Sequence, residues 1–278
     1  MKTKNLLIVF ALSSFTLSFI SCKKNDSTSD EIETTFELSG DQAVADNLTQ
    51  DANDVFNEAA TDKDLMGGRT PTETTGILSC ATVTVTPLVG FPKNIAIDFG
   101  AGCTSPNGIT RSGKINIVLS DSVRTPGSTA VMTFTNYYVS GFKKEGTITW
   151  TNTSTPGTRS WQRKVENGRI TAPDGRYWLH SGIRNVVQTT GVSTPNNLLD
   201  DVFSITGDHT VTNSAGKTRT ITTLTPLQKK VICDNIDKGS IKVQGANHYA
   251  VIDFGDGTCD RLATISIDGH TPRVILLR

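Results

Sequence analysis

Short runs of alternating β-branched residues recur between turn signals from residue 77 onward, about ten residues apart, with no long helical pattern between them. The clearest runs are ATVTVT at 81–86, KINIVL at 114–119, GTITWTN at 146–152, RTITTL at 219–224 and ATISI at 263–267. A period of two places apolar side chains on one face of each strand, and βαβ crossovers are not expected. The sequence therefore predicts an all-β domain over 77–278, an antiparallel meander forming a large curled sheet, a barrel or a sandwich. Within it, Asn167-Gly168 predicts a type I′ hairpin turn.

One helical pattern precedes these runs, in the stretch SGDQAVADNLTQDANDVFNEAA. Its apolar stripe consists of Val44, Leu48, Ala52, Val55 and Ala59. Spacings of three and four residues predict one N-terminal amphipathic helix over 39–66 that packs against the β domain, with a partner-binding or spacer helix as the alternative. Ser39 and Gln42 form a candidate capping box at its start, and the stretch MGGRTPT at 66–72 is expected to end it.

The chain begins with the segment MKTKNLLIVFALSSFTLSFISC, which has a basic start and an apolar core. The core at 6–20 has the length of a signal peptide and is short for a membrane span of about 20 apolar residues. The letters FISC at 19–22 resemble a bacterial lipobox, with a small residue before the cysteine. This resemblance implies that 1–21 is a signal peptide and that Cys22 is acylated, for example with palmitate. An uncleaved N-terminal anchor with an incidental Cys22 is the alternative, and a membrane attachment follows from either. In the acylated form several acyl chains make the anchor stable, because one chain alone binds reversibly.

The residues that follow Cys22 are polar and charged and show no packing pattern, so we expect a flexible tether over 22–38. Without 1–21 the chain loses two lysines, which leaves 27 − 2 = 25 basic residues against 27 acidic ones. A net charge near −2 without a basic stripe argues against nucleic acid as a partner. The expected partners are a membrane, reached through Cys22, and an envelope protein or a glycan.

Five cysteines give the second constraint on the fold. If Cys22 is acylated, four remain, an even number in an exported and oxidising context. We predict the disulfides Cys80–Cys103 and Cys233–Cys259 among the three connectivities, because each pair lies within one local segment that contains one copy of a repeated motif. A four-thiolate zinc site is the alternative, but the chain lacks CxxC-like spacing.

The repeated motif is Ile-Asp-Phe-Gly-x-Gly with a cysteine nearby, at 96–105 (AIDFGAGCTS) and at 251–260 (VIDFGDGTCD). Strand periodicity places its apolar residues on one face and Asp98 or Asp253 on the other. The two glycines suit a tight turn that needs positive φ. We therefore expect Asp98 and Asp253 to cap turns, with a shared binding role as the alternative.

The additional acids of the second copy invite a metal interpretation. Asp256 and Asp260 do not follow the alternate-position spacing of a calcium loop, and Ala101 and Ser105 replace them in the first copy. We therefore expect no metal site and no cofactor. The common part of the motif predicts a strand, a turn and a disulfide, which gives stapled modules at 77–120 and 231–278.

The lipobox, the paired motifs and the terminal stretch CDRLATISIDGHTPRVILL together resemble a group of Bacteroidota outer-membrane lipoproteins. The polar start after the cysteine, SCKKND, resembles signals associated with export to the cell surface in that phylum. The resemblance implies a lipid-anchored protein of the outer membrane that faces the cell surface or the periplasm. The resemblance implies no particular activity.

Catalytic motifs are not found in the sequence. The four histidines are His180, His209, His248 and His270, and none belongs to a compact metal-ligand pattern. The chain has no GxSxG elbow and no Walker loop, and nothing points to a triad assembled from distant strands. We therefore expect a non-catalytic envelope lipoprotein with a structural or binding role, and a hydrolase is the least favoured alternative.

A surface glycan-binding protein of a nutrient-uptake system is the other alternative. Its candidate ligand-binding residues are Trp161, Trp178 and Tyr177, because exposed aromatic rings on a rigid sheet can stack on sugars. Trp150 shares a strand face with Ile148, which predicts a core position for it.

Overall fold

The computed structural model describes residues 26–62, 65, 76–106, 108–194, 197, 199–233 and 235–277. One helix, α1, spans Asp26–Asp62 and precedes fourteen strands in a single sheet. The strands are β1 (Thr82–Thr86), β2 (Lys93–Asp98), β3 (Cys103–Thr104), β4 (Thr110–Leu119), β5 (Thr129–Val139), β6 (Phe142–Asn152), β7 (Ser160–Thr171), β8 (Tyr177–Thr190), β9 (Val202–Asn213), β10 (Thr218–Lys230), β11 (Lys238–Gln244), β12 (Tyr249–Asp256), β13 (Leu262–Ile267) and β14 (Arg273–Leu276). The signal segment, Cys22 and the 66–72 stretch lie outside the described residues.

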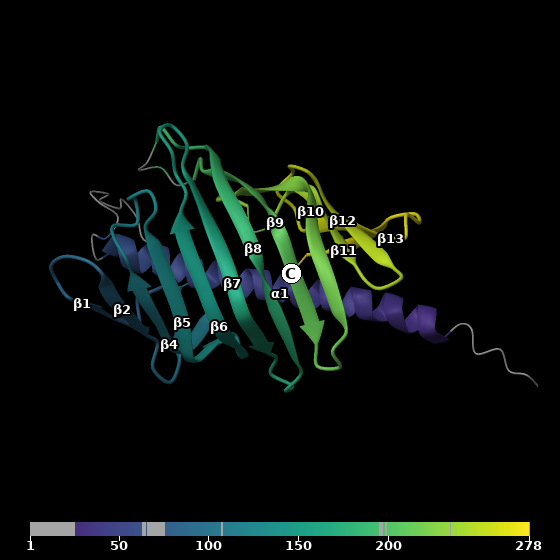
Figure 1. Ribbon diagram of the computed structural model, residues 1–278, viewed down its shortest axis with the longest axis horizontal. Helices are drawn as coiled ribbons and strands as arrows, with labels where there is room; N and C mark the ends of the chain where they lie inside the picture. Colours follow the sequence, from purple (N-terminus) through teal and green to yellow (C-terminus); the bar gives the residue numbers. More distant parts are fainter. Residues whose placement is uncertain are drawn as a thin grey trace, which may run out of the picture.

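The sheet is an antiparallel meander, as predicted. Strands follow one another in chain order from β1 to β14, except that the short β3 pairs only with β4. The two outer strands, β1 and β14, are not paired with each other, so the sheet is open. Of the three predicted arrangements, the structure therefore has the single curled sheet. In Figure 1, α1 runs along the long axis behind the strands, which cross it steeply.

The core lies between α1 and one face of the sheet, called the inner face below. The sheet contributes alternate strand residues, among them Ile95, Ile97, Ile115, Ile117, Met132, Ile148, Val165, Val211, Ile221 and Val243. α1 contributes the predicted stripe together with Leu38, Ala45, Phe56 and Ala60. Trp150 packs edge-on against Phe56 with ring centroids 6.0 Å apart, so its predicted core position is confirmed.

The length of α1 matches the width of the sheet, and its contacts follow the strand order in reverse. They run from Asp51 with β4 and β5 through Thr49 with β6, Gln50 with β7, Asp46 with β8 and Thr35 with β10 to Glu31 with the β11–β12 turn. From Asp51 to Glu31 the helix rises about 30 Å, and seven strand spacings from β4 to β11 cover about 34 Å. The strands β4 to β7 all reach residues 49–51 of α1, and the later strands meet it progressively closer to its start.

α1 begins earlier than predicted, because it already includes most of the expected tether at 22–38. The capping-box prediction was wrong. Ser39 Oγ donates to Thr35 O, and Gln42 Nε2 donates to Asp46 Oδ1, so both residues lie inside the helix. The first turns pack through polar contacts rather than an apolar stripe, which is why hydrophobic periodicity does not reveal them.

A row of irregular positions crosses the middle strands, and it is called the bulge row below. The pairing registers shift next to Gly113 in β4, at Asn136 in β5, at Gly146 in β6 and at Asn167 in β7, and all four residues have positive φ. Bulges bend a strand and increase its twist. Repeated on neighbouring strands, they curl the sheet around α1.

The predicted hairpin turn at Asn167-Gly168 was wrong, because both residues lie inside β7. Asn167 has a φ of 51°, the left-handed conformation that a type I′ turn also needs. Here that conformation forms a bulge between Val165 and Gly168 in the pairing with β8. An Asn-Gly pair suits a hairpin turn and a β-bulge equally well, so local residue preference does not distinguish the two.

Both predicted disulfides are confirmed. Cys80–Cys103 joins the turn before β1 to β3, with a Cα–Cα distance of 5.7 Å, and Cys233–Cys259 joins the segments after β10 and β12, with 5.3 Å. They lie at opposite ends of the sheet, where the two copies of the repeated motif form β2 and β12.

Candidate functional site

The most unusual region of the described structure is a layer of charged and polar side chains between α1 and the inner face, called the polar seam below. Its members on α1 are Asp46, Thr49, Gln50, Asp51 and Asp54, and its members on the sheet are Arg111, Tyr137, Lys144, Arg163, His180, Arg184 and His209. Buried polar groups cost free energy unless they are hydrogen-bonded, so this layer has to be assembled with matched partners.

Asp51 binds two donors from neighbouring strands. Arg111 Nε donates to Asp51 Oδ2 at 3.1 Å, Arg111 Nη2 pairs with the other carboxylate oxygen, and Tyr137 Oη donates to Oδ2 at 3.0 Å. Burial would lower the pKa of Arg111, but the bonds to Asp51 outweigh it and raise that pKa. Burial, and then the nearby charge of Asp51, raise the pKa of Tyr137 well above its usual value. Both groups therefore stay protonated and remain donors.

Two further cations approach α1 from β6 and β7. Lys144, which is 1% exposed, donates from Nζ to Thr49 Oγ1 at 3.0 Å, and Arg163 Nη1 donates to Gln50 Oε1 at 2.7 Å. Burial lowers the pKa of Lys144 to about 7, although nearby carboxylates oppose this shift. Burial also lowers the pKa of Arg163. Near neutral pH, Lys144 is therefore divided between its charged and neutral forms.

Asp46 lies at the centre of the seam. Arg184 Nη2 donates to its Oδ2 at 2.8 Å, and Gln42 Nε2 donates to its Oδ1 at 3.0 Å. Burial alone would raise the pKa of Asp46, but the charges of Arg184 and His209 outweigh it and lower the pKa to about 2. In contrast, burial raises the pKa of Asp54 to about 6, because its bond from Gln50 compensates only in part.

Two histidines complete the seam from β8 and β9. Burial lowers the pKa of His180 to about 3 and that of His209 to about 4. His180 Nε2 and His209 Nδ1 have no hydrogen-bond partner in the described part of the chain, so no acceptor stabilises an imidazolium there. A Cβ on Gly168 or Gly182 would lie 2.6–2.7 Å from these rings, so each ring fits only over a glycine.

The protonation of these histidines predicts an acid-sensitive fold. The unfolded chain binds a proton at each imidazole below about pH 6.5, whereas the folded chain does not until about pH 4 for His209 and about pH 3 for His180. Stability that is present above pH 6.5 is therefore lost as the pH falls, at about 2 kcal/mol per histidine between pH 7 and pH 5. Over the same range protonation of Asp54 returns about 1 kcal/mol, because its folded-state pKa is raised.

Chemical denaturation at pH 7 and pH 5 measures this loss. The free energy of unfolding should fall by about 3 kcal/mol in the parent protein. In His180→Gln and in His209→Gln the fall should be about 2 kcal/mol smaller, and in the exposed control His270→Gln it should be unchanged. A parent protein that is equally stable at both pH values would contradict the buried neutral state of the two rings.

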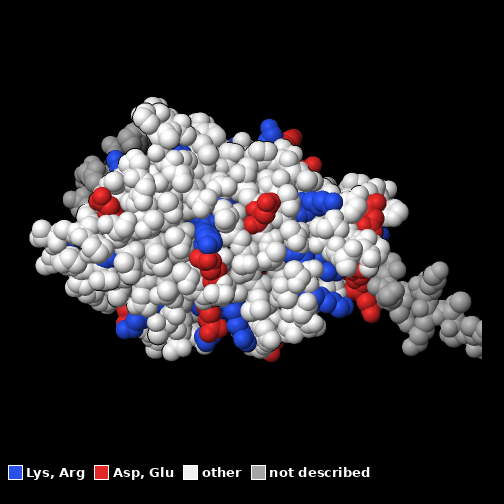
Figure 2. Space-filling model, viewed as in Figure 1, with Lys and Arg blue, Asp and Glu red and all other residues white. Residues whose placement is uncertain are grey.

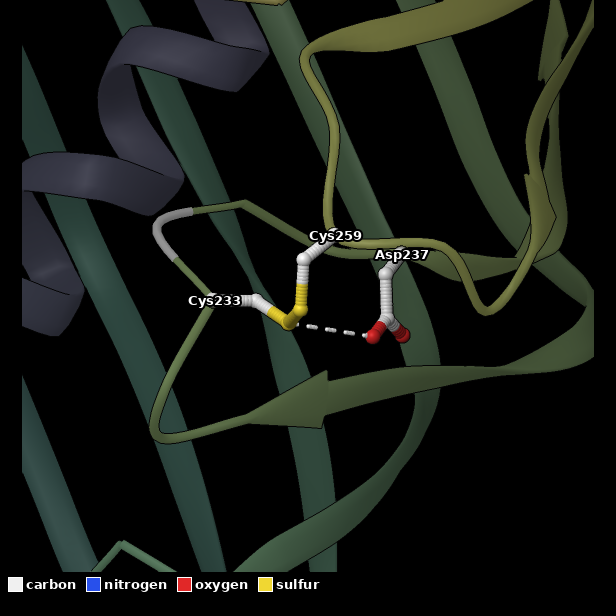
Figure 3. A group of neighbouring side chains, drawn as sticks. All are labelled: Cys233, Asp237 and Cys259. Atoms are coloured by element: carbon white, nitrogen blue, oxygen red, sulfur yellow. Dashed lines mark hydrogen bonds between the residues drawn. A yellow bond between two sulfur atoms is a disulfide. The ribbon is translucent and has the colours of Figure 1, made fainter.

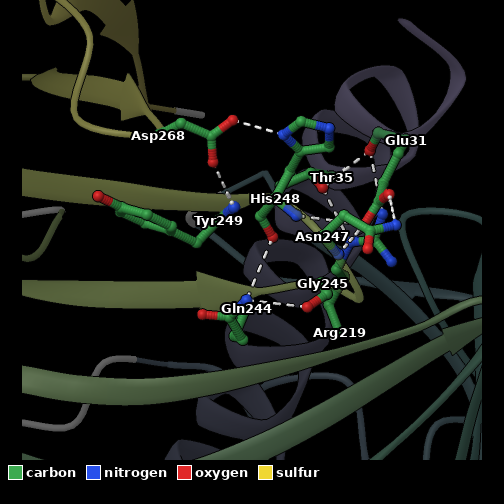
Figure 4. Close-up of polar contacts among 9 residues, drawn as sticks. All are labelled: Glu31, Thr35, Arg219, Gln244, Gly245, Asn247, His248, Tyr249 and Asp268. Carbon is green, nitrogen blue, oxygen red and sulfur yellow. Dashed lines mark hydrogen bonds and ion pairs between the residues drawn. The ribbon is translucent and has the colours of Figure 1, made fainter. Parts of the chain in front are cut away.

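A separate polar group holds the first turns of α1 (Figure 4). Glu31 accepts hydrogen bonds from the backbone N–H of Asn247 at 2.7 Å and from Asn247 Nδ2 at 2.9 Å. These bonds, the backbone bond first, lower the pKa of Glu31. Arg219 Nε donates to Thr35 Oγ1 at 2.8 Å, and Arg219 Nη2 donates to the carbonyl of Glu31 at 3.0 Å. The start of α1 is thus tied to β10 and to the β11–β12 turn.

The same region holds a histidine–carboxylate pair near the surface. His248 Nδ1 lies 2.5 Å from Asp268 Oδ2, and the other oxygen of Asp268 accepts the N–H of Tyr249 at 2.9 Å (Figure 4). The hydrogen bond from the Tyr249 backbone, followed by the contact with His248, lowers the pKa of Asp268. Among the described residues no hydroxyl or thiol nucleophile is hydrogen-bonded to His248, so the pair joins two turns and does not form a triad.

Figure 3 shows a group of described residues whose candidate metal-ligand atoms lie within 4.8 Å of one another. It consists of Cys233, Asp237 and Cys259, but both sulfurs belong to the disulfide and are not thiolates. Cys233 Sγ lies 3.4 Å from Asp237 Oδ2, and because a disulfide sulfur carries no proton, this is a packing contact. Lys230 Nζ pairs with Asp237 at 3.0 Å. The oxidised group therefore offers a metal one carboxylate that is already paired.

The two aspartates of the repeated motif have the same local geometry. Asp98 Oδ1 accepts the N–H of Gly100 at 2.9 Å, and Asp253 Oδ1 accepts the N–H of Gly255 at 2.9 Å. Asp98 therefore caps the turn that follows β2, as predicted. Asp253 makes the same bond inside β12, at an irregularity in the pairing with β11, so it does not cap a turn after its strand. Asp98 also pairs with Lys114 at 2.8 Å, and the bond from Lys114 followed by that from Gly100 lowers its pKa.

The structure does not bring the three candidate aromatic residues together. Trp178 is fully buried, packed edge-on against Phe142. Trp161 is half-buried against Phe203, at the start of β7. Tyr177 pairs with the last residue of β7, about 33 Å from Trp161, and its ring is covered by a guanidinium at 3.9 Å. These rings therefore do not form one stacking surface.

The residues of the polar seam were not singled out from the sequence, although a signal for some of them exists. Arg111 is in phase with the inward-facing Ile115 and Ile117, and Arg163 is in phase with Val165. A basic residue in phase with apolar strand residues predicts a buried cation. That position in turn implies an acidic or amide partner on the element that covers the sheet.

No helix in the described part of the chain combines the length and the apolar character that crossing a bilayer requires. Comparison of the chain with protein families, with curated proteins and with solved structures finds no match. The case for a function therefore depends on the residues and on their arrangement.

Proposed function

We propose that this chain is a lipid-anchored protein of the outer membrane that faces the cell surface or the periplasm, is held there by acyl groups on Cys22, and has a structural or binding role without catalysis. The lipobox letters FISC at 19–22 support the anchor, and the disulfides agree with an oxidising compartment.

The observation that carries the proposal is the lipobox at 19–22, and the position of α1 determines where an anchored protein would lie. The helix begins at Asp26, four residues after Cys22, so the connection between them spans at most about 14 Å. α1 is not a free spacer, because the polar seam and the contacts of Glu31 hold it against the sheet. An acylated Cys22 would therefore place the sheet directly at the bilayer, with the β11–β12 turn among the nearest parts.

The arrangement of polar groups supports a role without catalysis. His180 and His209 are enclosed between α1 and the sheet, where a substrate does not reach them. A surface glycan-binding protein stays the alternative, but burial of Trp178 and the distance between Trp161 and Tyr177 give it little support.

Mass spectrometry of the N-terminal peptide tests the proposal in a bacterial host that processes lipoproteins. The expected peptide begins at Cys22 and carries acyl chains, and the protein sediments with membranes. Cys22→Ser should lose the acyl mass, whereas the matched control Ser21→Gly should keep it, because a small residue still precedes the cysteine. A mature protein that begins at another residue or that carries no acyl group would contradict the proposal.

A further inference from the structure

Among the described residues, no strand pairs with the outer edge of β1. On its other side β1 pairs with β2 without a register shift. Its residues, TVTVT, include no charge and no proline. Natural proteins normally protect such an edge with charged residues, proline or a bulge, because its free N–H and C=O groups can pair with another strand. An edge without these features indicates a partner strand.

The surface beside this edge is also neutral. On the outer face, a shallow hollow next to β1 is lined by Thr84, Thr86, Asn94, Ala96, Asn116, Val118, Val131 and Thr133, with Ile95 and Ile117 at its floor. None of these side chains is charged. Figure 2 shows this face, where charged side chains are sparse over β1 to β5. A neutral surface does not repel an identical surface, so it suits self-association.

The loop that follows β1 presents apolar side chains to solvent. Leu88 and Val89 are 85% and 88% exposed, the highest values among the large hydrophobic residues of the described chain. Their loop is held in place, because the buried Lys93 donates from Nζ to the carbonyls of Pro87 at 2.9 Å and Leu88 at 3.0 Å. A fixed loop with exposed aliphatic side chains indicates a contact surface rather than a loose turn.

We propose that β1 is an interface between two copies of this chain, which pair antiparallel across a two-fold axis at Thr84. The strand sequence TVTVT reads the same in both directions. Centring the axis on Thr84 pairs all five residues, and it places threonine opposite threonine and Val83 opposite Val85 of the second copy. Cross-strand pairs of β-branched residues stabilise an antiparallel sheet.

The same arrangement gives the exposed loop a partner. In an antiparallel pair, the residues after Thr86 run beside the residues before Thr82 of the second copy. Leu88 and Val89 therefore approach the turn at 78–81 of the other chain, where Leu78 and Ala81 are only partly buried. One occupant, the second copy, thus accounts for both the free edge and the apolar loop.

The other edge strand suggests a different assembly, which the test has to separate from this one. Pairing of β1 with β14 of another copy would be head-to-tail and would generate open chains of molecules. β14 begins with Arg273, and its sequence RVIL does not read the same in both directions. A closed dimer through β1 is therefore the expected form.

Cysteine cross-linking of the full lipidated protein tests the interface. In Thr84→Cys the two new thiols face each other, so mild oxidation should convert most chains to a disulfide-linked dimer. Thr222→Cys, at an exposed position on an interior strand, is the matched control and should give only background cross-linking. Equal cross-linking of the two variants, or little in both, would overturn the proposal.

Mass measurement provides an independent readout of the same interface. The parent protein should have the mass of a dimer, and Thr84→Lys should have the mass of a monomer that keeps the β-sheet circular-dichroism signal of the parent, because Thr84 is exposed and two lysines would face each other. Thr222→Lys should remain a dimer. A monomeric parent protein, or a ladder of larger assemblies, would overturn the two-fold pairing.

Discussion

Replacing Asp51 with alanine should lower the free energy of unfolding by about 3–5 kcal/mol. Asp51 accepts hydrogen bonds from Arg111 and Tyr137, both of which are almost fully buried. Without the carboxylate, the guanidinium of Arg111 stays in the interior without its charge partner, and such a charge costs more than the lost pair contributes. Denaturant unfolding at neutral pH measures the change.

Two further variants separate the buried charge from a general effect of altering α1. Glu33→Ala removes an exposed acid from the same helix and should change stability by less than about 0.5 kcal/mol. The triple variant Asp51→Leu, Arg111→Met and Tyr137→Phe removes the whole group and should recover most of the loss, because apolar residues of similar size replace it. A cost below about 1 kcal/mol for Asp51→Ala would contradict the described pairing.

Replacing Gly113 with alanine should have a still larger effect, above about 4 kcal/mol, and the variant is expected to accumulate poorly. Gly113 has a φ of 78° in the bulge row, and an added Cβ would lie 1.9 Å from the carbonyl oxygen of Asn136 on the next strand. The contact involves backbone on both sides, so it is relieved only if β4 and β5 separate.

Gly157 offers a matched control for backbone strain. Its φ is 77°, nearly the same as that of Gly113, but an added Cβ would meet no atom within 4 Å. Gly157→Ala should therefore cost only the left-handed conformation, about 1–2 kcal/mol. Folded yield and denaturant unfolding compare the two variants. Equal losses would show that the strands do not approach as closely at the bulge row as described.

The sequence predicts the main elements of this fold but not how they fit together. Alternating residues between turn signals identify the strands, and short connections make neighbours in the chain neighbours in the sheet. The disulfides follow from their local spacing and from the repeated motif. The curl of the sheet does not follow, because it depends on bulges at residues such as Asn167, whose positive φ a hairpin turn would also require.

The polar seam cannot be predicted from the sequence for a related reason. α1 packs through Asp46, Gln50 and Asp51 as well as through its apolar stripe, and a hydrophobic pattern cannot distinguish a buried acid from an exposed one. The partners of these residues lie on strands distant in the chain, and each pairing depends on how the helix crosses the sheet. For the same reason the sequence predicts a tether where the structure has the first turns of α1, which are held by Glu31 and Thr35.

Hydrogen exchange of the α1 amides tests most directly whether this helix is the buried centre of the fold. If the polar seam and the apolar stripe hold α1 as described, the amides of residues 44–60 should exchange only with global unfolding, as slowly as those of β5 to β8. Exchange of α1 that is orders of magnitude faster than exchange of these strands would show that the helix detaches from an intact sheet. That result would contradict the account.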